Sequence, residues 1–181
     1  MHEDIQRILV REEEIHAGLR RLAEEVTAAF GAGPLTVVSV LKGSCIFCAD
    51  LIREIPIPLE LAFCSARSYG DDTVAGDLEL VFPDAGEIAG RRVLLVDDIL
   101  DTGRTLSSVR AELVRQGALE VRTCVLLDKP ARRRVSFRAD HVGFEVEDVF
   151  VVGYGLDYAG RYRNLRYIGC LKDEAVTVGT P

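Results

Sequence analysis

Segments of two kinds alternate along this chain, and this alternation restricts the possible fold more than any other feature of the sequence. The stretch from Leu35 to Leu41 has strand length and is rich in β-branched residues, as in strands that are buried on both faces of a parallel sheet. Helical stretches with an apolar face separate such strands. The pattern predicts an α/β fold, with a parallel twisted sheet flanked by helices. The expected elements are a helix at 12–30, a strand at 35–41, a helix from about 44 to 55, strands at 59–65, 78–82 and 92–96, a helix at 105–116 and a strand at 119–127.

The ends of two helices are marked by familiar signals. Three glutamates at 12–14 favour a helix start because acidic side chains interact well with the positive end of the helix dipole. The Gly-Ala-Gly-Pro segment at 31–34 ends that helix. The helix at 105–116 ends at Gly117, and its expected inner face consists of Leu106, Val109, Leu113 and Val114.

Length and charge narrow the class of protein. A chain of 181 residues suggests a single domain, and it can bury a core without disulfides. The net charge of −7 argues against a general nucleic-acid binder. No apolar run approaches the roughly 18 residues of a membrane span, and the acidic start does not look like a signal peptide. We therefore expect a cytoplasmic protein without a membrane partner.

The five cysteines do not suggest a disulfide framework, because their number is odd and no secretion signal is present. Cys45 and Cys48 have a spacing that also occurs in zinc and redox sites. No second pair of this kind follows, and the three histidines are scattered. We interpret both cysteines as small apolar residues within a buried helix.

Two regions depart from the alternation of strands and helices. Residues 68–77 are small and polar, and together with the strand at 78–82 they predict either a hairpin tip or a mobile lid. Short aromatic-rich segments interrupted by glycines follow His141. From about Asp173 the chain has no anchoring pattern, and we expect it to be frayed.

The strongest chemical signal is the segment from Val93 to Leu106, which reads VLLVDDILDTGRTL. A buried strand runs into two acids and is followed by a polar turn and a helix. In an open parallel sheet, ligands bind at the carboxyl ends of the strands. Backbone amides of the turn, the helix N-terminus and the hydroxyls of Thr102 and Thr105 suit a phosphate group. The glycine at 103 allows the backbone to approach a ligand closely.

The adjacent acids Asp97 and Asp98 need an explanation other than phosphate binding. Asp97 and Asp98 point to opposite sides of the strand, and neither can enter a core unpaired without a large penalty. Carboxylates beside a bound phosphate commonly hold Mg²⁺ or the hydroxyls of a sugar. A plainer interpretation makes Asp101 a helix cap and leaves the other two acids as ordinary charges at a strand end. The patterns of P-loops and dinucleotide folds are absent.

The segment resembles the phosphoribosyl-diphosphate motif of the type I phosphoribosyltransferases. Four further segments occur in the order expected for the hypoxanthine-guanine phosphoribosyltransferase family: Leu41–Gly43, Ser68–Tyr69, Leu127–Pro130, and 142–145 followed by 150–158. The resemblance covers nearly the whole chain. It implies one domain over residues 1–181, with a small hood formed by residues 1–12 and 145–181 and a lid at 68–82. It also implies a homodimer or homotetramer.

The resemblance implies purine salvage, in which the N9 atom of a 6-oxopurine displaces pyrophosphate from phosphoribosyl diphosphate in a Mg²⁺-dependent reaction. Asp97 and Asp98 match residues that meet the ribose and the metal, although the family usually has glutamate at the first position. Asp157 matches a ligand of a second Mg²⁺. In the family, the peptide bond at the position of Leu41–Lys42 can be cis. The other matches on the phosphate side are Thr102, Gly103, Arg104 and Thr105 for the phosphate, and Lys42, Gly43, Ser68, Tyr69 and Arg163 for the pyrophosphate.

On the base side, Asp101 matches the catalytic acid near purine N7, and we expect it to cap the helix as well. Lys129 matches a donor to the 6-oxo group, which disfavours adenine because an ammonium has no acceptor. Phe150 matches the residue that stacks on the base, and the backbone of Val151 matches the contact to its edge.

Three other readings of the sequence remain possible. Adenine enzymes of the family carry alanine at the position of Asp101. An RNA-binding regulator with the same fold would carry tyrosine there and a basic face, whereas the only basic cluster here is 132–134, which we interpret as a solvated surface. A nucleotide-binding module without turnover also fits the motifs.

Overall fold

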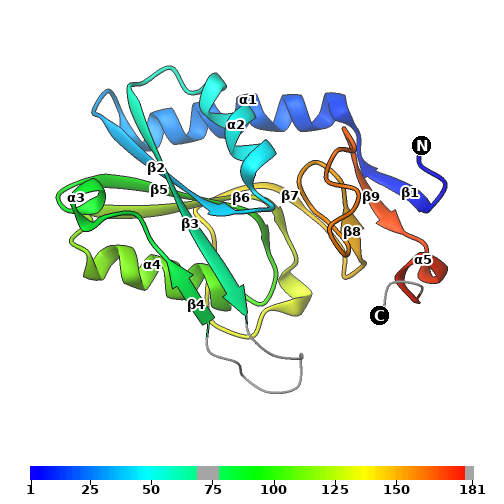
Figure 1. Cartoon of the computed structure of the whole chain (residues 1–181). Helices are drawn as coiled ribbons and strands as arrows, with labels where there is room; N and C mark the ends of the chain where they lie inside the picture. Colours follow the sequence, from blue (N-terminus) through cyan, green and yellow to red (C-terminus); the bar gives the residue numbers. More distant parts are fainter. Residues whose placement is uncertain (69–77, 178–181) are drawn as a thin grey trace.

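Two sheets form the framework of the molecule, which is described here by a computed structural model (Figure 1). The structure describes residues 1–68 and 78–177. The elements in chain order are β1 (Ile5–Val10), α1 (Glu12–Phe30), β2 (Leu35–Leu41), α2 (Cys45–Glu54), β3 (Leu59–Ser68), β4 (Leu78–Val81), α3 (Ala85–Ile88), β5 (Arg92–Leu100), α4 (Arg104–Arg115), β6 (Glu120–Asp128), a 3₁₀ turn (Pro130–Arg132), β7 (His141–Glu145), β8 (Val151–Val152), β9 (Ile168–Leu171) and α5 (Asp173–Thr177).

The larger sheet has six strands in the order β4-β3-β2-β5-β6-β7. Its strands are parallel except for β4, which pairs with β3 in the antiparallel direction at one edge. Neighbouring residues of its strands face opposite layers of the core. Val37 and Leu94 pack on one face, whereas Val38 and Leu95 pack on the other. The predicted fold of a parallel sheet between helices is therefore confirmed.

Helices cover both faces of this sheet, with α1 and α2 on one side and α3 and α4 on the other (Figure 1). The predicted apolar face of α1 is buried, and the helix begins at Glu12 as its acidic first turn indicates. The prediction for α4 is correct for Leu106, Val109 and Leu113 and wrong for Val114, which is 57% exposed. One residue after Leu113 the helix has turned by about 100°, and this rotation carries the side chain of Val114 away from the sheet.

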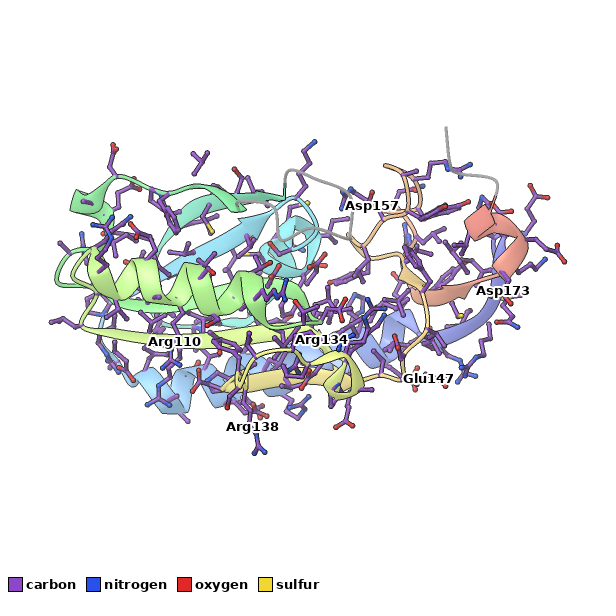
Figure 2. All side chains as sticks on the ribbon, turned by 90° about the horizontal axis from the view of Figure 1, so that it is seen from below. Arg110, Arg134, Arg138, Glu147, Asp157 and Asp173 are labelled. Atoms are coloured by element: carbon purple, nitrogen blue, oxygen red, sulfur yellow. The ribbon has the colours of Figure 1, made fainter. Side chains whose placement is uncertain are left out.

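The smaller sheet is antiparallel and has the strand order β1-β9-β8. It thus joins the N-terminal strand to two strands from the last third of the chain. The expectation of a frayed end from Asp173 is wrong for residues 173–177, which form α5 (Figure 2). The hydroxyl of Tyr158 donates a hydrogen bond to the carbonyl of Val176 in this helix. The side chain of Val176 also packs against the cluster around Ile5 and Tyr162.

Several strands are longer than their sequence patterns suggest. β5 continues through both of its acids to Leu100, because Asp97, Ile99 and Leu100 still pair with β6. Of the lid expected at 68–82, residues 69–77 lie outside the described part of the chain, while 78–81 form β4. In the described ranges, no helix combines the length and the apolar character of a membrane span.

Candidate active site

The turn between β5 and α4 lies at the carboxyl edge of the larger sheet, where the sequence places its chemistry. Gly103 is the residue before the helix and has a φ of 84°, in the left-handed region that favours glycine. A Cβ atom there would lie 3.0 Å from Val135 Cγ2 and 3.2 Å from Arg133 Cδ. Glycine thus satisfies both the backbone conformation and the tight packing against the following loop.

The prediction that Asp101 caps α4 is wrong. The N-cap residue is Gly103, and no side chain makes the capping hydrogen bond. Since β5 extends to Leu100, the turn starts later than expected and Asp101 lies two residues before the cap. Its carboxylate instead forms an ion pair with Arg132, with 2.8 Å between Oδ1 and Nε.

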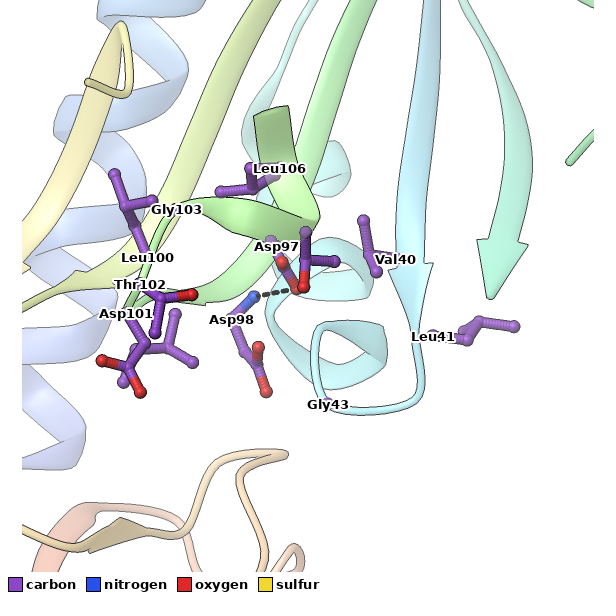
Figure 3. Close-up of a pocket in the computed structure, with 12 residues that line it drawn as sticks. Val40, Leu41, Gly43, Asp97, Asp98, Leu100, Asp101, Thr102, Gly103 and Leu106 are labelled. Atoms are coloured by element: carbon purple, nitrogen blue, oxygen red, sulfur yellow. Dashed lines mark hydrogen bonds between the residues drawn. The ribbon is translucent and has the colours of Figure 1, made fainter. Parts of the chain in front are cut away.

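A first cavity of about 320 Å³ opens between the ends of β2 and β5 and the start of α4 (Figure 3). Thr102, Gly103 and Thr105 line it, together with the three acids of the segment. The hydroxyl oxygen of Thr102 also accepts a hydrogen bond from the amide of Arg104, at 3.4 Å. Hydroxyls, backbone amides and the positive end of a twelve-residue helix therefore meet in one hollow, which is an arrangement suited to a phosphate group.

Asp97 and Asp98 occupy the same cavity, with side chains that point in different directions (Figure 3). Asp97 is only 7% exposed, and its Oδ1 accepts a hydrogen bond from the amide of Asp98 at 3.0 Å. Burial and the neighbouring Asp98 carboxylate raise the pKa of Asp97 well above its usual range. Burial also raises the pKa of Asp98. The pair is therefore poorly compensated in the free protein and suited to a cation.

Gly43 lies directly opposite Asp98 on the turn that follows β2 (Figure 3). A Cβ atom at this position would lie 1.7 Å from Asp98 Oδ2. The preceding Leu41–Lys42 peptide bond is cis. Both Leu41 and Gly43 line the first cavity.

A second cavity of about 490 Å³ adjoins the first and shares Asp98, Ile99 and Asp101 with it. Lys129 lines this cavity and is 5% exposed, so it is not a surface lysine. Its Nζ donates a hydrogen bond to the carbonyl of Val149 at 2.6 Å. Burial lowers the pKa of Lys129.

The opposite wall of the second cavity comes from residues 148–151 and 156–157. Phe150 is 44% exposed and packs edge-on against Tyr158, with 5.1 Å between the ring centroids. Val151 is buried at the start of β8. The wall thus offers a fixed aromatic face beside backbone hydrogen-bonding groups.

Arg163 and Asp157 contact each other at the edge of this region. Arg163 Nη2 lies 2.6 Å from Asp157 Oδ1, and the same guanidinium donates a hydrogen bond to the carbonyl of Gly155. The other oxygen of Asp157 accepts a hydrogen bond from the amide of Gly160 at 2.8 Å. Both oxygens of Asp157 are therefore already engaged.

Not every predicted site residue reaches the cavities. Lys42 and Arg104 are exposed and belong to the lining of neither cavity. The backbone of Ser68 ends β3, and Tyr69 lies outside the described residues.

Two charged residues of the second cavity, Arg132 and Asp148, are not among the site residues predicted from the sequence. Arg132 Nη1 lies 3.4 Å from Asp148 Oδ1, in addition to its pair with Asp101. The expectation that the three arginines at 132–134 form a solvated surface is wrong for Arg133: its side chain is 17% exposed, and its guanidinium pairs with Asp128. The sequence signal that could have indicated these contacts is the position of the run, which begins three residues after Lys129.

The cysteines form no site in the part of the chain that the structure describes. All five are free thiols, and no cluster of three metal-ligating side chains occurs among the described residues. The interpretation of Cys45 and Cys48 as buried helix residues is correct for Cys48 alone. Cys45 is exposed at the first position of α2.

Comparisons with known proteins agree with this geometry. Residues 8–159 match the family model described as the phosphoribosyl transferase domain. The hypoxanthine-guanine phosphoribosyltransferase of Bacillus subtilis is 45% identical, over 95% of this chain and 96% of that protein. A crystal structure of a hypoxanthine phosphoribosyltransferase from Staphylococcus aureus has a TM-score of 0.91 at 39% identity, covering 97% of this chain and 96% of the other.

A longer relative is also similar. The bifunctional protein TilS/HprT of Listeria innocua is 48% identical over 96% of this chain. The present chain spans only 27% of the length of that protein.

Proposed function

The chain belongs to the phosphoribosyl transferase family and, within it, to the hypoxanthine-guanine phosphoribosyltransferases, and on this premise we propose that it is a purine salvage enzyme. It transfers the phosphoribosyl group of phosphoribosyl diphosphate to N9 of hypoxanthine or guanine. The C1′–pyrophosphate bond breaks and the C1′–N9 bond forms. The products are IMP or GMP and pyrophosphate.

The observation that carries this proposal is the pair of adjoining cavities with Asp98 and Asp101 in both linings. The first has the groups that bind a phosphate, and the second has a buried lysine and an aromatic ring. A sugar phosphate and a flat base therefore fit side by side, with the reacting C1′ atom at the shared wall. Two substrates held in this way react as if in one molecule, which removes much of the entropic barrier.

On the sugar-phosphate side, we assign the 5-phosphate to the turn at Thr102, Gly103, Arg104 and Thr105. Asp97 and Asp98, which line the first cavity, are assigned to the ribose hydroxyls. Lys42, the backbone of Gly43, Ser68, Tyr69 and Arg163 are assigned to the pyrophosphate. The planar guanidinium of Arg163 suits a pair of phosphate oxygens, although it must first exchange its contacts with Asp157 and Gly155.

Mg²⁺ fits the acidic pair. Asp97 and Asp98 supply hard oxygen ligands, and because burial raises the pKa of both, a bound cation would favour their charged forms. Mg²⁺ commonly takes one or two carboxylates and completes its shell with water and substrate phosphates, so a full protein cage is not required. When bound, it supplies charge neutralisation of the departing pyrophosphate. Asp157 is assigned to a second Mg²⁺, in exchange for its pair with Arg163.

Asp101 is assigned as the catalytic acid–base group. Its carboxylate lies in the wall that both cavities share, where it can accept the N7 proton as N9 attacks. In the free protein the carboxylate pairs with Arg132. The incoming base has to replace that contact.

Base choice is assigned to the second cavity. The buried ammonium of Lys129 donates to the 6-oxo group and offers no acceptor to the amino group of adenine. Phe150 and Val151 line this cavity, and we assign Phe150 to stacking on the base and the backbone of Val151 to its edge. A site built to donate hydrogen bonds discriminates strongly against a ligand that leaves its buried donor unpaired.

The fold also supports proposals about the hood, the oligomeric state and the cellular location. We assign the small β1-β9-β8 sheet and its loops to the hood, since residues 150–157 wall the base cavity. Leu61, Phe63 and Val81 are exposed apolar residues on one face of β3 and β4, which supports a homodimer or homotetramer. The five free thiols suit a reducing compartment and support a cytoplasmic location.

One experiment tests the function. The protein is incubated with Mg²⁺, phosphoribosyl diphosphate and each of hypoxanthine, guanine and adenine, and nucleotide and pyrophosphate are measured. We expect product with the 6-oxopurines, and a decrease in kcat of about 10²- to 10⁴-fold for Asp101→Ala. Product with adenine alone would overturn the base assignment. An RNA-binding regulator would give no product with any purine, and the pairing of Arg132 and Arg133 with acids leaves this alternative without structural support.

A further inference from the structure

We propose that Arg133 is a positioning residue that fixes the catalytic turn at 100–103, and this inference rests on the function proposed above. Arg133 touches neither cavity that we assign to the substrates. It acts through the backbone of the residues that do. Within the run of three arginines, Arg133 therefore contributes to catalysis from behind the site.

The contacts of its guanidinium converge on the turn. Arg133 Nη1 donates to the carbonyl of Leu100 at 3.0 Å and also to the carbonyl of Asp101. Nη2 donates to the carboxylate of Asp128, the last residue of β6. One planar group thus ties the two peptide groups that flank Asp101 to the end of the neighbouring strand.

The backbone of the same loop adds to this brace. The amide of Lys129 donates to the carbonyl of Leu100 at 3.0 Å, and the amide of Arg134 donates to the carbonyl of Thr102 at 2.9 Å. The carbonyls of Leu100, Asp101 and Thr102 are therefore all bonded to residues 129–134. The catalytic carboxylate and the buried lysine of the base cavity are held in one hydrogen-bonded unit.

Burial makes this arrangement specific to arginine. The side chains of Arg133 and Asp128 are 17% and 18% exposed, so the ion pair is largely shielded from water. A lysine keeps the charge, but a single ammonium does not reproduce the planar fork that reaches two carbonyls and a carboxylate together. Arg133→Lys should therefore fold and loosen the turn.

Arg134 provides a matched control. It is the next residue in the chain and carries the same charge, but its side chain is exposed. Its contact to the turn comes from its backbone amide, which Arg134→Ala retains.

We expect Arg133→Lys to lower kcat for hypoxanthine by about 10- to 100-fold, since a displacement of roughly 1 Å in a catalytic group has an effect of this order. KM for phosphoribosyl diphosphate should change much less. Arg134→Ala should stay within about threefold of wild type in both parameters. Hydrogen exchange of the backbone amides at 101–105 should become about tenfold faster in Arg133→Lys and remain unchanged in Arg134→Ala.

A double-mutant cycle separates positioning from a general structural role. In an Asp101→Asn background, Arg133→Lys should lower kcat by less than about threefold, because the group that it positions is already lost. An equal loss in both backgrounds, or unchanged hydrogen exchange at 101–105, would overturn the inference. If the wild type makes no nucleotide, the proposed function fails and the kinetic claim with it. The exchange measurement then still decides whether Arg133 holds the turn.

Discussion

Replacing Gly43 with alanine should uncouple the stability of the fold from its activity. The new Cβ would lie 1.7 Å from Asp98 Oδ2, so the carboxylate must move by roughly 1.7 Å to reach an ordinary contact distance. The backbone at Gly43 lies outside the left-handed region, so alanine fits it without strain. Only the end of the Asp98 side chain has to yield. We expect the free energy of unfolding to stay within about 1 kcal/mol of wild type.

Activity should respond much more strongly. A displacement of this size at a group assigned to the ribose and Mg²⁺ should lower kcat/KM for phosphoribosyl diphosphate by about 100-fold, or about 2.7 kcal/mol of transition-state stabilisation. Steady-state kinetics and thermal unfolding of the same samples measure the two effects.

The matched control is Gly86→Ala in α3, where no atom lies within 4 Å of the new Cβ, and it should leave the kinetics unchanged. A Gly43→Ala enzyme with wild-type kcat/KM would refute the placement of Asp98 at the substrate. A large loss of stability would refute the claim that only this side chain moves.

Three further predictions concern the base, the metal and the assembly. Lys129→Gln should lower kcat/KM for hypoxanthine by about 10- to 100-fold, because a hydrogen bond from a buried charge is lost, and should narrow the preference over adenine; an unchanged ratio of kcat/KM for the two bases would contradict this. Chelation of Mg²⁺ should abolish nucleotide formation. The Mg²⁺ concentration that gives the half-maximal rate should increase as the pH falls, because Asp97 and Asp98 become protonated. Since the pKa values of both carboxyl groups are raised, this increase should begin at a higher pH than for ordinary carboxylates. Phe63→Asp should lower the molecular mass of the protein in solution, measured by light scattering. Leu119→Asp, at an exposed residue in the connection between α4 and β6, should leave this mass unchanged. Equal masses for Phe63→Asp and the wild type would show that Phe63 does not belong to the interface.

The parts of the fold that follow from local sequence patterns could be predicted. The composition of a strand such as Leu35–Leu41 is enough to predict that both of its faces are buried, and Gly103 indicates the turn before α4. Most of the residues that line the first cavity come from one segment, residues 97–106, so the location of the cavity could be predicted from the sequence.

The errors at the cap of α4, at α5 and at Arg133 have a different physical origin, since each of them depends on a partner that is distant in sequence. β5 continues past its acids because β6 supplies a ladder partner, and this extension displaced the helix cap from Asp101 to Gly103. α5 is anchored by Tyr158 and by the cluster around Ile5. No local pattern reveals such contacts, and the same applies to the bonds of Arg133 with Leu100 and Asp101.

The division of the molecule into two separately hydrogen-bonded sheets has a consequence for how such an enzyme can diversify. The turn of the first cavity lies at the edge of the larger sheet, whereas residues 148–151 and 156–157, in and around the smaller sheet, form one wall of the second cavity. Substitutions in this wall can therefore change the proposed base cavity while the proposed phosphate turn keeps its place on the larger sheet. Lys129, which follows β6 of the larger sheet, would remain a constant donor while the rest of the base site varies.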